Sequence, residues 1–211
     1  MAFCFLPLRF NYDDLAPAMS PATALWHHDV VHGEYLAAIN RLVAPYPELA
    51  ASTIEEILSQ PERVPSGLLD EVRHQGGGHA NHQFMWKILG ASRRTRPSGA
   101  LALAIDRTFA DFDGFTRAFA SAAMAHAGDG WAFLSLVAPR SQAIEIVTTH
   151  GNGNVLELHK PGVMICDLWE HAYHDQHRGD RAAWLEAYFE VVDWSQCSIR
   201  YDRLVAGQPT P

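Results

Sequence analysis

The sequence has few cysteines, an excess of acidic over basic side chains, and no repeat. Its three cysteines, Cys4, Cys166 and Cys197, are odd in number and do not have the spacing of a metal-binding motif, which indicates free thiols in a reducing compartment. Lysine and arginine together number 16 against 24 aspartates and glutamates, so the formal net charge is -8. This balance argues against a nucleic-acid-binding protein, because no extended basic face would offset phosphate repulsion.

Long apolar runs are also missing. No stretch of the 211 residues is long enough to span a bilayer, and the apolar start, residues 1–10, has no basic region ahead of it, which argues against a secretory signal. We therefore expect a cytoplasmic protein without a membrane partner. With 48% hydrophobic and 19% charged residues, the chain should bury a substantial core in one domain or two small ones.

Helical periodicity dominates the first half of the chain. Apolar side chains recur at helical spacing over residues 21–45 and predict a long helix that Pro45 and Pro47 end. A capping-box pattern near residues 52–55 predicts a short helix that runs to about residue 61. A third helix is predicted from about residue 66 to residue 89.

Three consecutive glycines, residues 76–78, lie inside this third helix. Glycine destabilises a helix interior, so the run indicates either a break or a place where another backbone segment passes very close. A polar segment at residues 93–99 then predicts a domain boundary, which divides the chain into residues 1–92 and 93–211.

The second half mixes helical and strand patterns. Helices are predicted over residues 100–110 and 115–124, and the alternation in residues 131–137 and 143–149 predicts a β-hairpin. At least one further strand is predicted within residues 155–166. A last amphipathic helix is predicted over residues 181–194, followed by a frayed tail after residue 204.

Metal-ligand chemistry is concentrated at the end of that last predicted strand. Asp167 and His171 are four residues apart, so a carboxylate oxygen and an imidazole nitrogen can converge on one ion. Alone, such a pair is equally typical of an exposed ion pair on a helix. His27 and His82 lie beside large aromatics on two upstream helices, and the four residues together make a set of three imidazoles and one carboxylate. This set suits a redox metal with one coordination position left open.

Four segments carry a resemblance to a known family. TALWHHDVVHGEYLAAIN, QGGGHANHQFMWKIL, GDGWAFLSL and DLWEHAYHDQH resemble, in the same order and along nearly the whole chain, the iron/manganese superoxide dismutase family. The resemblance implies an α+β fold with an N-terminal hairpin domain of long helices and a C-terminal α/β domain with a three-stranded antiparallel sheet. It places the metal site between the two.

The resemblance also assigns residues position by position. It implies one Fe or Mn ion per subunit, with metal ligands His27, His82, Asp167 and His171. Tyr35 matches a tyrosine that controls substrate access, and Arg181 matches a basic residue near the entrance. The aromatic residues that surround the metal are matched by Trp86, Trp131 and Trp169. Glu170 matches the residue that reaches across a subunit interface to the partner's ligand histidine, equivalent to His171. A homodimer or higher homo-oligomer is therefore implied.

Several positions depart from the family pattern. A glutamine that bonds metal-bound solvent is expected either just before Gly128, where the sequence has Ala127, or at Gly78, and neither position can supply it. We hypothesise that His126, one residue away, replaces it.

The second departure concerns the expected partners of the subunit interface. The histidine one turn after the first ligand and the tyrosine three residues after the last are replaced by Val31 and His174. Such outer changes are either benign, or they alter the redox potential, the delivery of protons or the reaction itself. His174 therefore joins Tyr35 and His126 among the candidate catalytic groups.

Two functions follow from the sequence. The first is a superoxide dismutase, which converts superoxide to dioxygen and hydrogen peroxide by cycling a mononuclear Fe or Mn between trivalent and divalent states. The second is a relative that keeps the metal site but catalyses another oxidation or is not catalytic, since a fold does not fix a function. In the first case superoxide is an anion and the chain is acidic, so attraction must be local, with Arg181 as its expected source.

Overall fold

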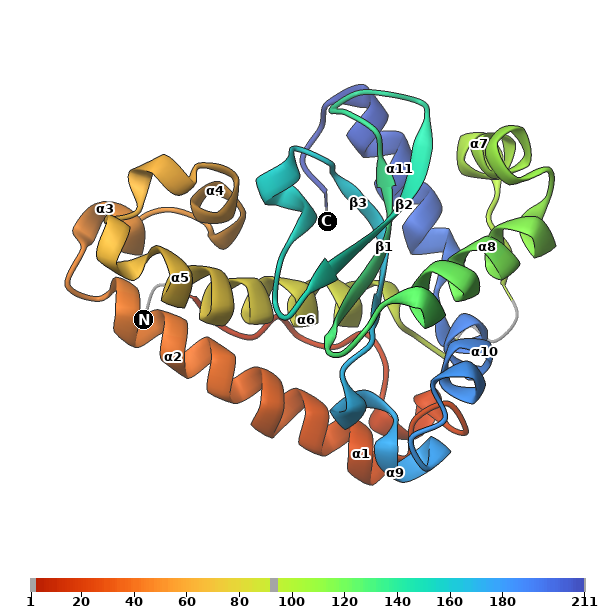
Figure 1. Ribbon diagram of the computed structural model, residues 1–211, viewed down its shortest axis with the longest axis horizontal. Helices are drawn as coiled ribbons and strands as arrows, with labels where there is room; N and C mark the ends of the chain where they lie inside the picture. The colour runs from red at the N-terminus through yellow and green to blue at the C-terminus, as the bar shows by residue number, and fades with distance from the viewer. Residues whose placement is uncertain (1–2, 92–94, 211) are drawn as a thin grey trace.

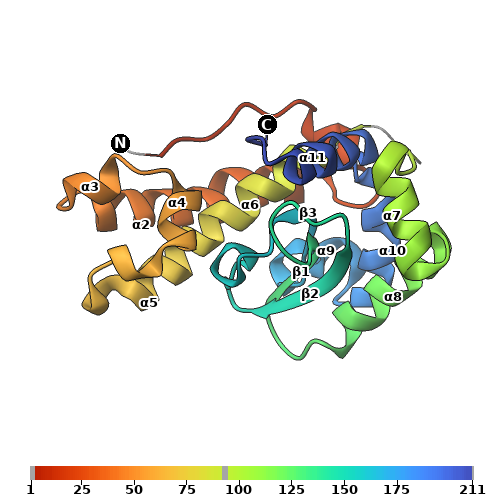
Figure 2. The same cartoon turned by 90° about the horizontal axis from the view of Figure 1, so that it is seen from above.

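The computed structural model describes residues 3–91 and 95–210 (Figure 1). Helices from the first half of the chain lie beside a three-stranded antiparallel sheet and its own helices, and Figure 2 shows these two parts next to each other. The predicted α+β class is confirmed. The predicted boundary between residues 92 and 93 falls outside the described residues, and the division into residues 1–92 and 93–211 stays a prediction.

The first long helix forms as the sequence predicts. α1 (Pro21–Leu25) begins where the Ser20 side chain accepts a backbone hydrogen bond, with proline at the first helical position. The helix continues through a π-helical turn, Trp26–His32, into α2 (Gly33–Val43). It ends before the prolines at positions 45 and 47. The π-helical turn is not visible in the sequence pattern, and such turns occur frequently at functional sites.

Two short helices follow α2. α3 (Pro47–Ala50) leads into α4 (Ile54–Ser59), which has a complete capping box. In this box the Thr53 side chain accepts a hydrogen bond from the Glu56 backbone amide, while the Glu56 side chain accepts one from the Thr53 amide. The box lies one residue further along the chain than predicted.

The third helical stretch runs without a break through its three glycines. α5 (Leu69–Glu71) passes through a second π-helical turn, Val72–Gly76, into α6 (Gly77–Ile88). The predicted alternatives were a break or a close approach of another segment, and the structure shows the close approach.

Two of the glycines are needed for that approach. A Cβ atom at Gly77 would lie 2.1 Å from the backbone oxygen of Asn152, and one at Gly78 would lie 2.6 Å from the ring of Tyr35. Both distances are shorter than van der Waals contact, so neither position accommodates a larger side chain without displacing its neighbour. The glycines thus bring α6 against the end of the sheet and against α2.

The three-stranded sheet forms part of the larger hydrophobic core. β1 (Gly130–Leu136) is central and pairs antiparallel with β2 (Ile144–His150) on one side and β3 (Gly162–Asp167) on the other. Trp131 is paired with Asp167 across the ladder. Every residue of β1 and β3 is buried, which requires cover on both faces.

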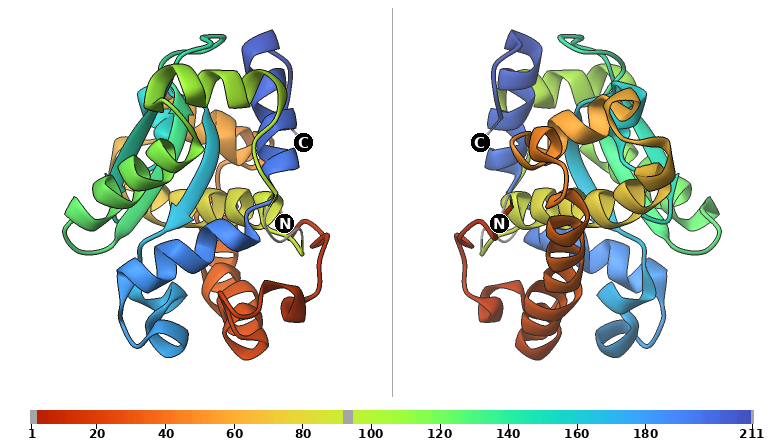
Figure 3. Two further views of the ribbon diagram at one scale, coloured as in Figure 1. Left: turned by 90° about the vertical axis from the view of Figure 1, so that its right-hand side faces the viewer. Right: turned by 90° about the vertical axis from the view of Figure 1, so that its left-hand side faces the viewer.

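Helices supply this cover. α7 (Gly99–Phe109) and α8 (Phe112–Ala125) contact β2, α8 also contacts β1, and α6 contacts β3 (Figure 3). The predicted hairpin and third strand are therefore confirmed. The segment Val155–Leu158, however, is a 3-10 helix, and only the later part of residues 155–166 forms the strand. A one-turn helix, α9 (His174–His177), follows the predicted metal-binding segment.

The C-terminal prediction is partly wrong. α10 (Arg181–Val191) ends three residues early, and a separate helix that was not predicted, α11 (Trp194–Ala206), follows it, contacts β3 and extends into the first two residues of the expected tail. The break occurs because Val192 bridges Leu89 in extended conformation. The Asp193 side chain then caps the new helix by accepting hydrogen bonds from the backbone amides of Ser195 and Gln196.

Two apolar clusters pack on either side of α6. The larger joins the sheet to the C-terminal helices, and the smaller fills the helical part with side chains that include Leu36, Ile39, Ile54, Ile57 and Val72. The three cysteines are free thiols, as predicted. Within the described residues, no helix combines the length and the apolar character that a bilayer crossing requires.

Candidate metal centre

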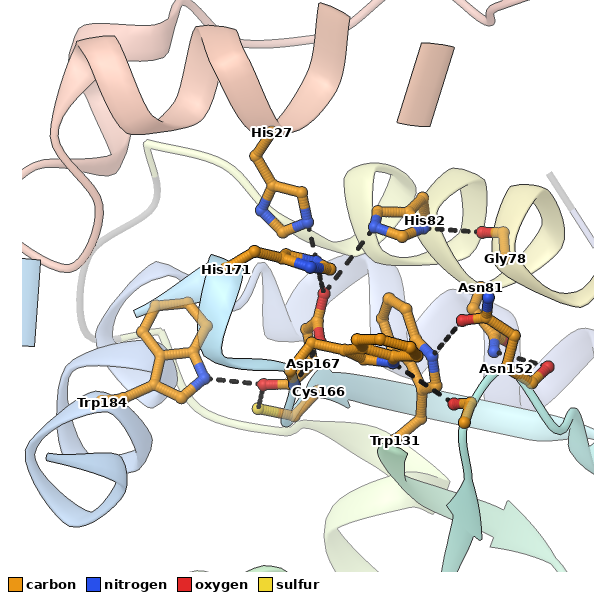
Figure 4. A network of polar contacts seen from close by, with 12 residues as sticks. His27, Gly78, Asn81, His82, Trp131, Asn152, Cys166, Asp167, His171 and Trp184 are labelled. Atoms are coloured by element: carbon orange, nitrogen blue, oxygen red, sulfur yellow. Dashed lines mark hydrogen bonds and ion pairs between the residues drawn. The ribbon is translucent and has the colours of Figure 1, made fainter. Parts of the chain in front are cut away.

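Four side chains from four elements converge between the two apolar clusters (Figure 4). His27 comes from the π-helical turn, His82 from α6, Asp167 from the end of β3, and His171 from the 3-10 turn that follows. One donor atom from each lies within 4.8 Å of the other three. His27, His82 and Asp167 are fully buried, and His171 is partly exposed.

Asp167 lies at the centre of the group. Its Oδ2 atom is 3.1 Å from His171 Nε2, 3.2 Å from His27 Nε2 and 3.8 Å from His82 Nε2. The His27 contact is short but lacks hydrogen-bond geometry, and neither His27 Nε2 nor His82 Nε2 has a hydrogen-bond partner in the described structure. Buried, unpartnered imidazole nitrogens beside a carboxylate fit a metal ion, which would satisfy both.

The second nitrogen of His82 fixes its orientation. His82 Nδ1 lies 2.7 Å from the carbonyl oxygen of Gly78, to which it donates, so Nε2 keeps its lone pair for a ligand bond. Because Gly78 is four residues earlier on α6, the helix itself supplies this acceptor. The metal-facing nitrogen is therefore set by local backbone structure.

The charge states of the ligands also suit a metal. Burial lowers the pKa of His27, with the nearby Asp167 carboxylate opposing it, and burial lowers the pKa of His82 well below its usual value. Burial alone would raise the pKa of Asp167, but the charge and hydrogen bond of His171 and the nearby imidazole of His27 outweigh it and lower this pKa. The result is an ionised carboxylate beside the neutral imidazoles of His27 and His82, as metal coordination requires.

Aromatic rings enclose the group as predicted. Ring centroids are 5.1 Å apart for Trp86 and His27, 4.9 Å for Trp131 and His82, and 5.7 Å for Trp169 and His171. The rings keep bulk water away from most of the site, which strengthens electrostatic interactions inside it.

Two groups hold Asp167 in place. The backbone amide of Trp169 donates to Asp167 Oδ1 at 2.8 Å, and the indole of Trp184 donates to the Asp167 carbonyl at 2.8 Å. The sequence analysis missed Trp184. It assigned that residue only to the inward face of the last amphipathic helix, and nothing in its spacing indicates a bond to Asp167.

Tyr35 borders the site on the side of α2. Its ring centroid lies 5.4 Å from that of His82, and burial raises the pKa of Tyr35, partly offset by interaction with the Asn152 side chain. The phenol therefore stays protonated through neutral pH and can act as a hydrogen-bond donor.

Asn152 is the second residue that the sequence analysis missed. The side chain is 4% exposed, accepts a hydrogen bond from the Trp131 indole at 3.2 Å, and donates to the His74 carbonyl at 3.0 Å. It reaches the site from the turn after β2. The family pattern predicts an amide side chain at the positions of Ala127 and Gly78 only. The one sequence signal for Asn152 is weak: an asparagine between two glycines at the end of the predicted hairpin.

The predicted substitute, His126, is placed elsewhere. Its Nε2 atom lies 3.2 Å from the Asp129 carbonyl oxygen, and its ring packs on His150 with centroids 4.4 Å apart. No described contact joins it to a ligand or to Tyr35. Ala127 is exposed, and its methyl side chain has no hydrogen-bonding group. This placement does not support the hypothesis that His126 replaces the missing glutamine.

Arg181 is fixed by hydrogen bonds to several segments of the chain. Its guanidinium donates to the carbonyls of His126 at 2.7 Å, Gly128 at 2.9 Å and Leu168 at 3.1 Å, and to the Tyr173 hydroxyl at 3.2 Å. These bonds tie the start of α10 to the segment before β1 and to the segment after β3. Any attraction of an anion by Arg181 stays a prediction.

The residues expected at a subunit interface lie on the surface of this single chain. Glu170 and His174 are exposed, and their side chains approach to 4.0 Å. Val31 is half-buried on the π-helical turn. Next to them, Leu25, Trp26 and Val30 expose 48%, 44% and 41% of their surfaces, and the ring of Trp26 lies 6.4 Å from that of His171.

Comparisons with known proteins agree with this geometry. Residues 2–90 match the family described as iron/manganese superoxide dismutases, alpha-hairpin domain, and residues 97–200 match iron/manganese superoxide dismutases, C-terminal domain. The chain is 35% identical over 195 residues to manganese superoxide dismutases of Listeria monocytogenes serovar 1/2a and Listeria innocua serovar 6a, covering 92% of this chain and 95% of each relative. It is 34% identical over 197 residues to manganese superoxide dismutase 1 of Leptolyngbya boryana, covering 92% of this chain and 79% of the relative.

Proposed function

The chain belongs to the iron/manganese superoxide dismutase family, and from this premise we propose how its own residues serve the dismutation of superoxide. It is a metal-dependent oxidoreductase with a mononuclear site of three histidines and one aspartate. The observation that carries the assignment is the convergence of the four donor atoms within 4.8 Å. The three relatives are named as manganese enzymes, so manganese is the first metal to test, with iron as the alternative.

The ligand set defines what the protein contributes. His27, His82, Asp167 and His171 would hold the ion, and the ion supplies the one-electron exchange that oxidises one superoxide to dioxygen and reduces the next to hydrogen peroxide. The buried Asp167 carboxylate offsets part of the positive charge in a site that the aromatic rings shield from water. The hydrogen bonds from the Trp169 amide and the Trp184 indole hold this carboxylate and its backbone carbonyl in position.

We assign proton supply to Tyr35, with Asn152 as a residue that positions it. Formation of peroxide from superoxide consumes protons, and a phenol with a raised pKa is present as a donor at neutral pH. Asn152 accepts a hydrogen bond from the Trp131 indole and interacts with Tyr35. It therefore positions these two side chains, which together with Asn152 form a polar wall next to His82. Asn152 thereby takes the place of the amide side chain that the sequence analysis sought at Ala127 and Gly78.

The direct test is a superoxide assay on protein whose metal content has been measured. With xanthine oxidase as the superoxide source, we expect activity that scales with the bound manganese or iron. Full occupancy without activity above that of free metal would reject the dismutase function and leave the alternative of a non-dismutase relative.

Replacing Asn152 with alanine is expected to lower dismutase activity by roughly 10- to 100-fold, as for other residues that orient a metal site from outside it. The change removes the acceptor of the Trp131 indole and the partner of Tyr35. Steady-state rates across pH, with metal content measured in parallel, check this. Asn152→Gln should recover part of the activity, because it restores the amide.

His126→Ala is the matched comparison for the Asn152 variant. Because the His126 ring lies against Asp129, Gly130 and His150 and has no described contact with a metal ligand, we expect a much smaller effect. Equal losses in the two variants would remove the assignment of the amide role to Asn152 and return it to His126.

We propose that two copies of the chain associate through Glu170 and His171. The exposed carboxylate of Glu170 makes a 4.0 Å contact to His174 as its one ion pair within the described residues, and the apolar side chains Leu25, Trp26 and Val30 are also exposed. A contiguous apolar surface next to a ligand histidine is typical of a protein interface. In such a dimer, Glu170 of each subunit would lie next to the metal site of the other subunit and help to close it.

Replacing Glu170 with alanine is expected to shift the protein towards the monomer and to increase the rate at which it loses metal. The reason is that His171 would lose a charged partner from the second subunit, and truncating one member of such a pair costs roughly 2–5 kcal/mol at an interface. Sedimentation velocity at several concentrations and metal release to a chelator measure both effects. Glu62→Ala, at an exposed position in the helical part, serves as control. An unchanged dimer and unchanged release rate would contradict the role of Glu170.

A further inference from the structure

A second cavity lies behind the aromatic wall of the metal centre. Its volume is about 290 Å³, and it is enclosed by the N-terminal arm, α6 and α11. Figure 2 shows the arm passing α6 and α11 on that side of the molecule. Trp86 separates the cavity from the ligands, since the same indole lines the cavity and packs on His27.

Three basic side chains line this cavity. Arg9 comes from the arm, Lys87 from α6 and Arg200 from α11. Within residues 3–91 and 95–210, none of the three forms an ion pair with a carboxylate. Glu55 is the acidic group that acts on both Lys87 and Arg200, and it is not within ion-pair distance of either. The protein as a whole is acidic, so this local excess of positive charge stands out.

The positive charges destabilise one another. Burial lowers the pKa of Lys87, and the charges of Arg200 and Arg9 lower it further. Burial lowers the pKa of Arg200 to about 10. Arg200 remains protonated at neutral pH, and an anion between the two side chains would relieve the repulsion.

Arg200 is held rigidly but is not saturated. Its Nε atom donates to the Gly162 carbonyl at 2.6 Å, and its guanidinium carbon lies 4.1 Å from the centroid of the Phe84 ring. The two terminal nitrogens have no hydrogen-bond partner within the part of the chain that the structure describes. A fixed guanidinium with free donors is well suited to bind a carboxylate.

Two deeply buried polar atoms belong to side chains that line the same cavity. Trp86 Nε1 and His32 Nδ1 have no hydrogen-bond partner among the described residues, and both side chains line the cavity. Trp86 is 5% exposed and His32 is 1% exposed, so neither atom is satisfied by bulk water. The other ring nitrogen of His32 is occupied by His79 at 2.8 Å. Buried unpartnered polar atoms require an explanation, and a bound molecule provides one.

The remaining lining defines the class of molecule. Leu6, Pro7, Leu8 and Ile88 make part of the cavity apolar, and Gln83 and Gln196 add two amide side chains to its lining. An inorganic anion would lose hydration against these side chains without gaining apolar contact, whereas an organic acid buries its carbon atoms there. We propose that this cavity binds a small organic monocarboxylate, with its carboxylate at Lys87, Arg9 and Arg200 and its apolar body against the arm.

This site is distinct from the metal centre, because none of the four ligands lines it. It adjoins the centre through Trp86, which packs on His27, and through His32, whose ring stacks on that of His82 at 5.4 Å. Its volume is near the lower end of ligand pockets, which are roughly 300–1,000 Å³. Short aliphatic carboxylates are therefore the appropriate probes.

Isothermal titration of the metal-loaded enzyme with sodium hexanoate tests the proposal. We expect saturable binding with a dissociation constant of about 1 mM or below, and binding of hexan-1-ol at least about tenfold weaker, because the alcohol lacks the charge. Absence of saturation with hexanoate, equal binding of the alcohol, or saturation by phosphate in place of hexanoate would each overturn the proposal.

Matched variants locate the site. Lys87→Met keeps the length of the side chain but removes its charge, and we expect it to weaken hexanoate binding at least about tenfold. Lys160→Met is the control, because Lys160 pairs with Glu145 at 2.9 Å far from the cavity lining. If Lys87→Met fails to fold by circular dichroism, Arg9→Met on the exposed arm takes its place. Unchanged affinity in the folded cavity variant would overturn the location.

Discussion

Asp167→Asn is expected to give a folded protein that retains little manganese or iron and has no dismutase activity above that of free metal. Asp167 is the only anionic side chain in the ligand group, and its Oδ2 atom lies within 3.2 Å of two ligand nitrogens. The amide has the same shape but no charge, so it cannot offset the charge of a di- or trivalent ion in a buried site. Metal affinity should fall by more than the roughly 10- to 100-fold that residues outside the ligand set contribute.

Metal analysis of the purified variant and the xanthine oxidase assay measure the two effects. Asp202→Asn, at an exposed position on α11, is the control and should retain both metal and activity. Thermal unfolding separates ligand loss from misfolding: metal should raise the melting temperature of the wild type but not that of Asp167→Asn, since only the wild type binds it. A variant with normal metal content and normal activity would show that Asp167 is not a ligand.

The four ligands were predictable because each is embedded in a local pattern. His82 is preceded by the glycine run and followed by Trp86, and Asp167 and His171 lie in one heptapeptide. The same holds for the first long helix and the hairpin, where periodicity and prolines define the elements. Local sequence thus determines most of the metal centre and the elements that carry it.

Asn152 was not predictable in this way. Its partners are the His74 carbonyl, the Trp131 indole and Tyr35, each of which is far from it in sequence. Its role arises only when the turn after β2 packs against α6. A single asparagine in a glycine-rich turn is equally typical of a turn without any function.

The C-terminal helix and the π-helical turns illustrate the same limit. The break before α11 depends on the bridge between Val192 and Leu89, which joins segments about a hundred residues apart. The turn Trp26–His32 has no glycine or proline to mark its register. In both cases long-range packing decides the backbone, and the sequence pattern alone favours a simpler helix.

Gly77→Ala is the second change with a large expected effect. The added Cβ would lie 2.1 Å from the backbone oxygen of Asn152, and a backbone atom cannot move aside as a flexible side chain does. Overpacking of this kind destabilises a protein by roughly 1–3 kcal/mol, and the short distance places this site at the upper end or beyond. Because the strain displaces Asn152, dismutase activity per bound metal should also fall.

Gly67→Ala provides a control of the same chemical change. No atom lies within 4 Å of a Cβ at that position, and Gly67 lies in a short 3-10 helix in the same part of the chain. Alanine there should leave stability unchanged or raise it by up to about 1 kcal/mol through the unfolded state. Urea unfolding of the two variants and activity per bound metal make the comparison. If both alanines behave alike, α6 does not pack against the Asn152 turn, and the polar wall beside Tyr35 and His82 is assembled in another way.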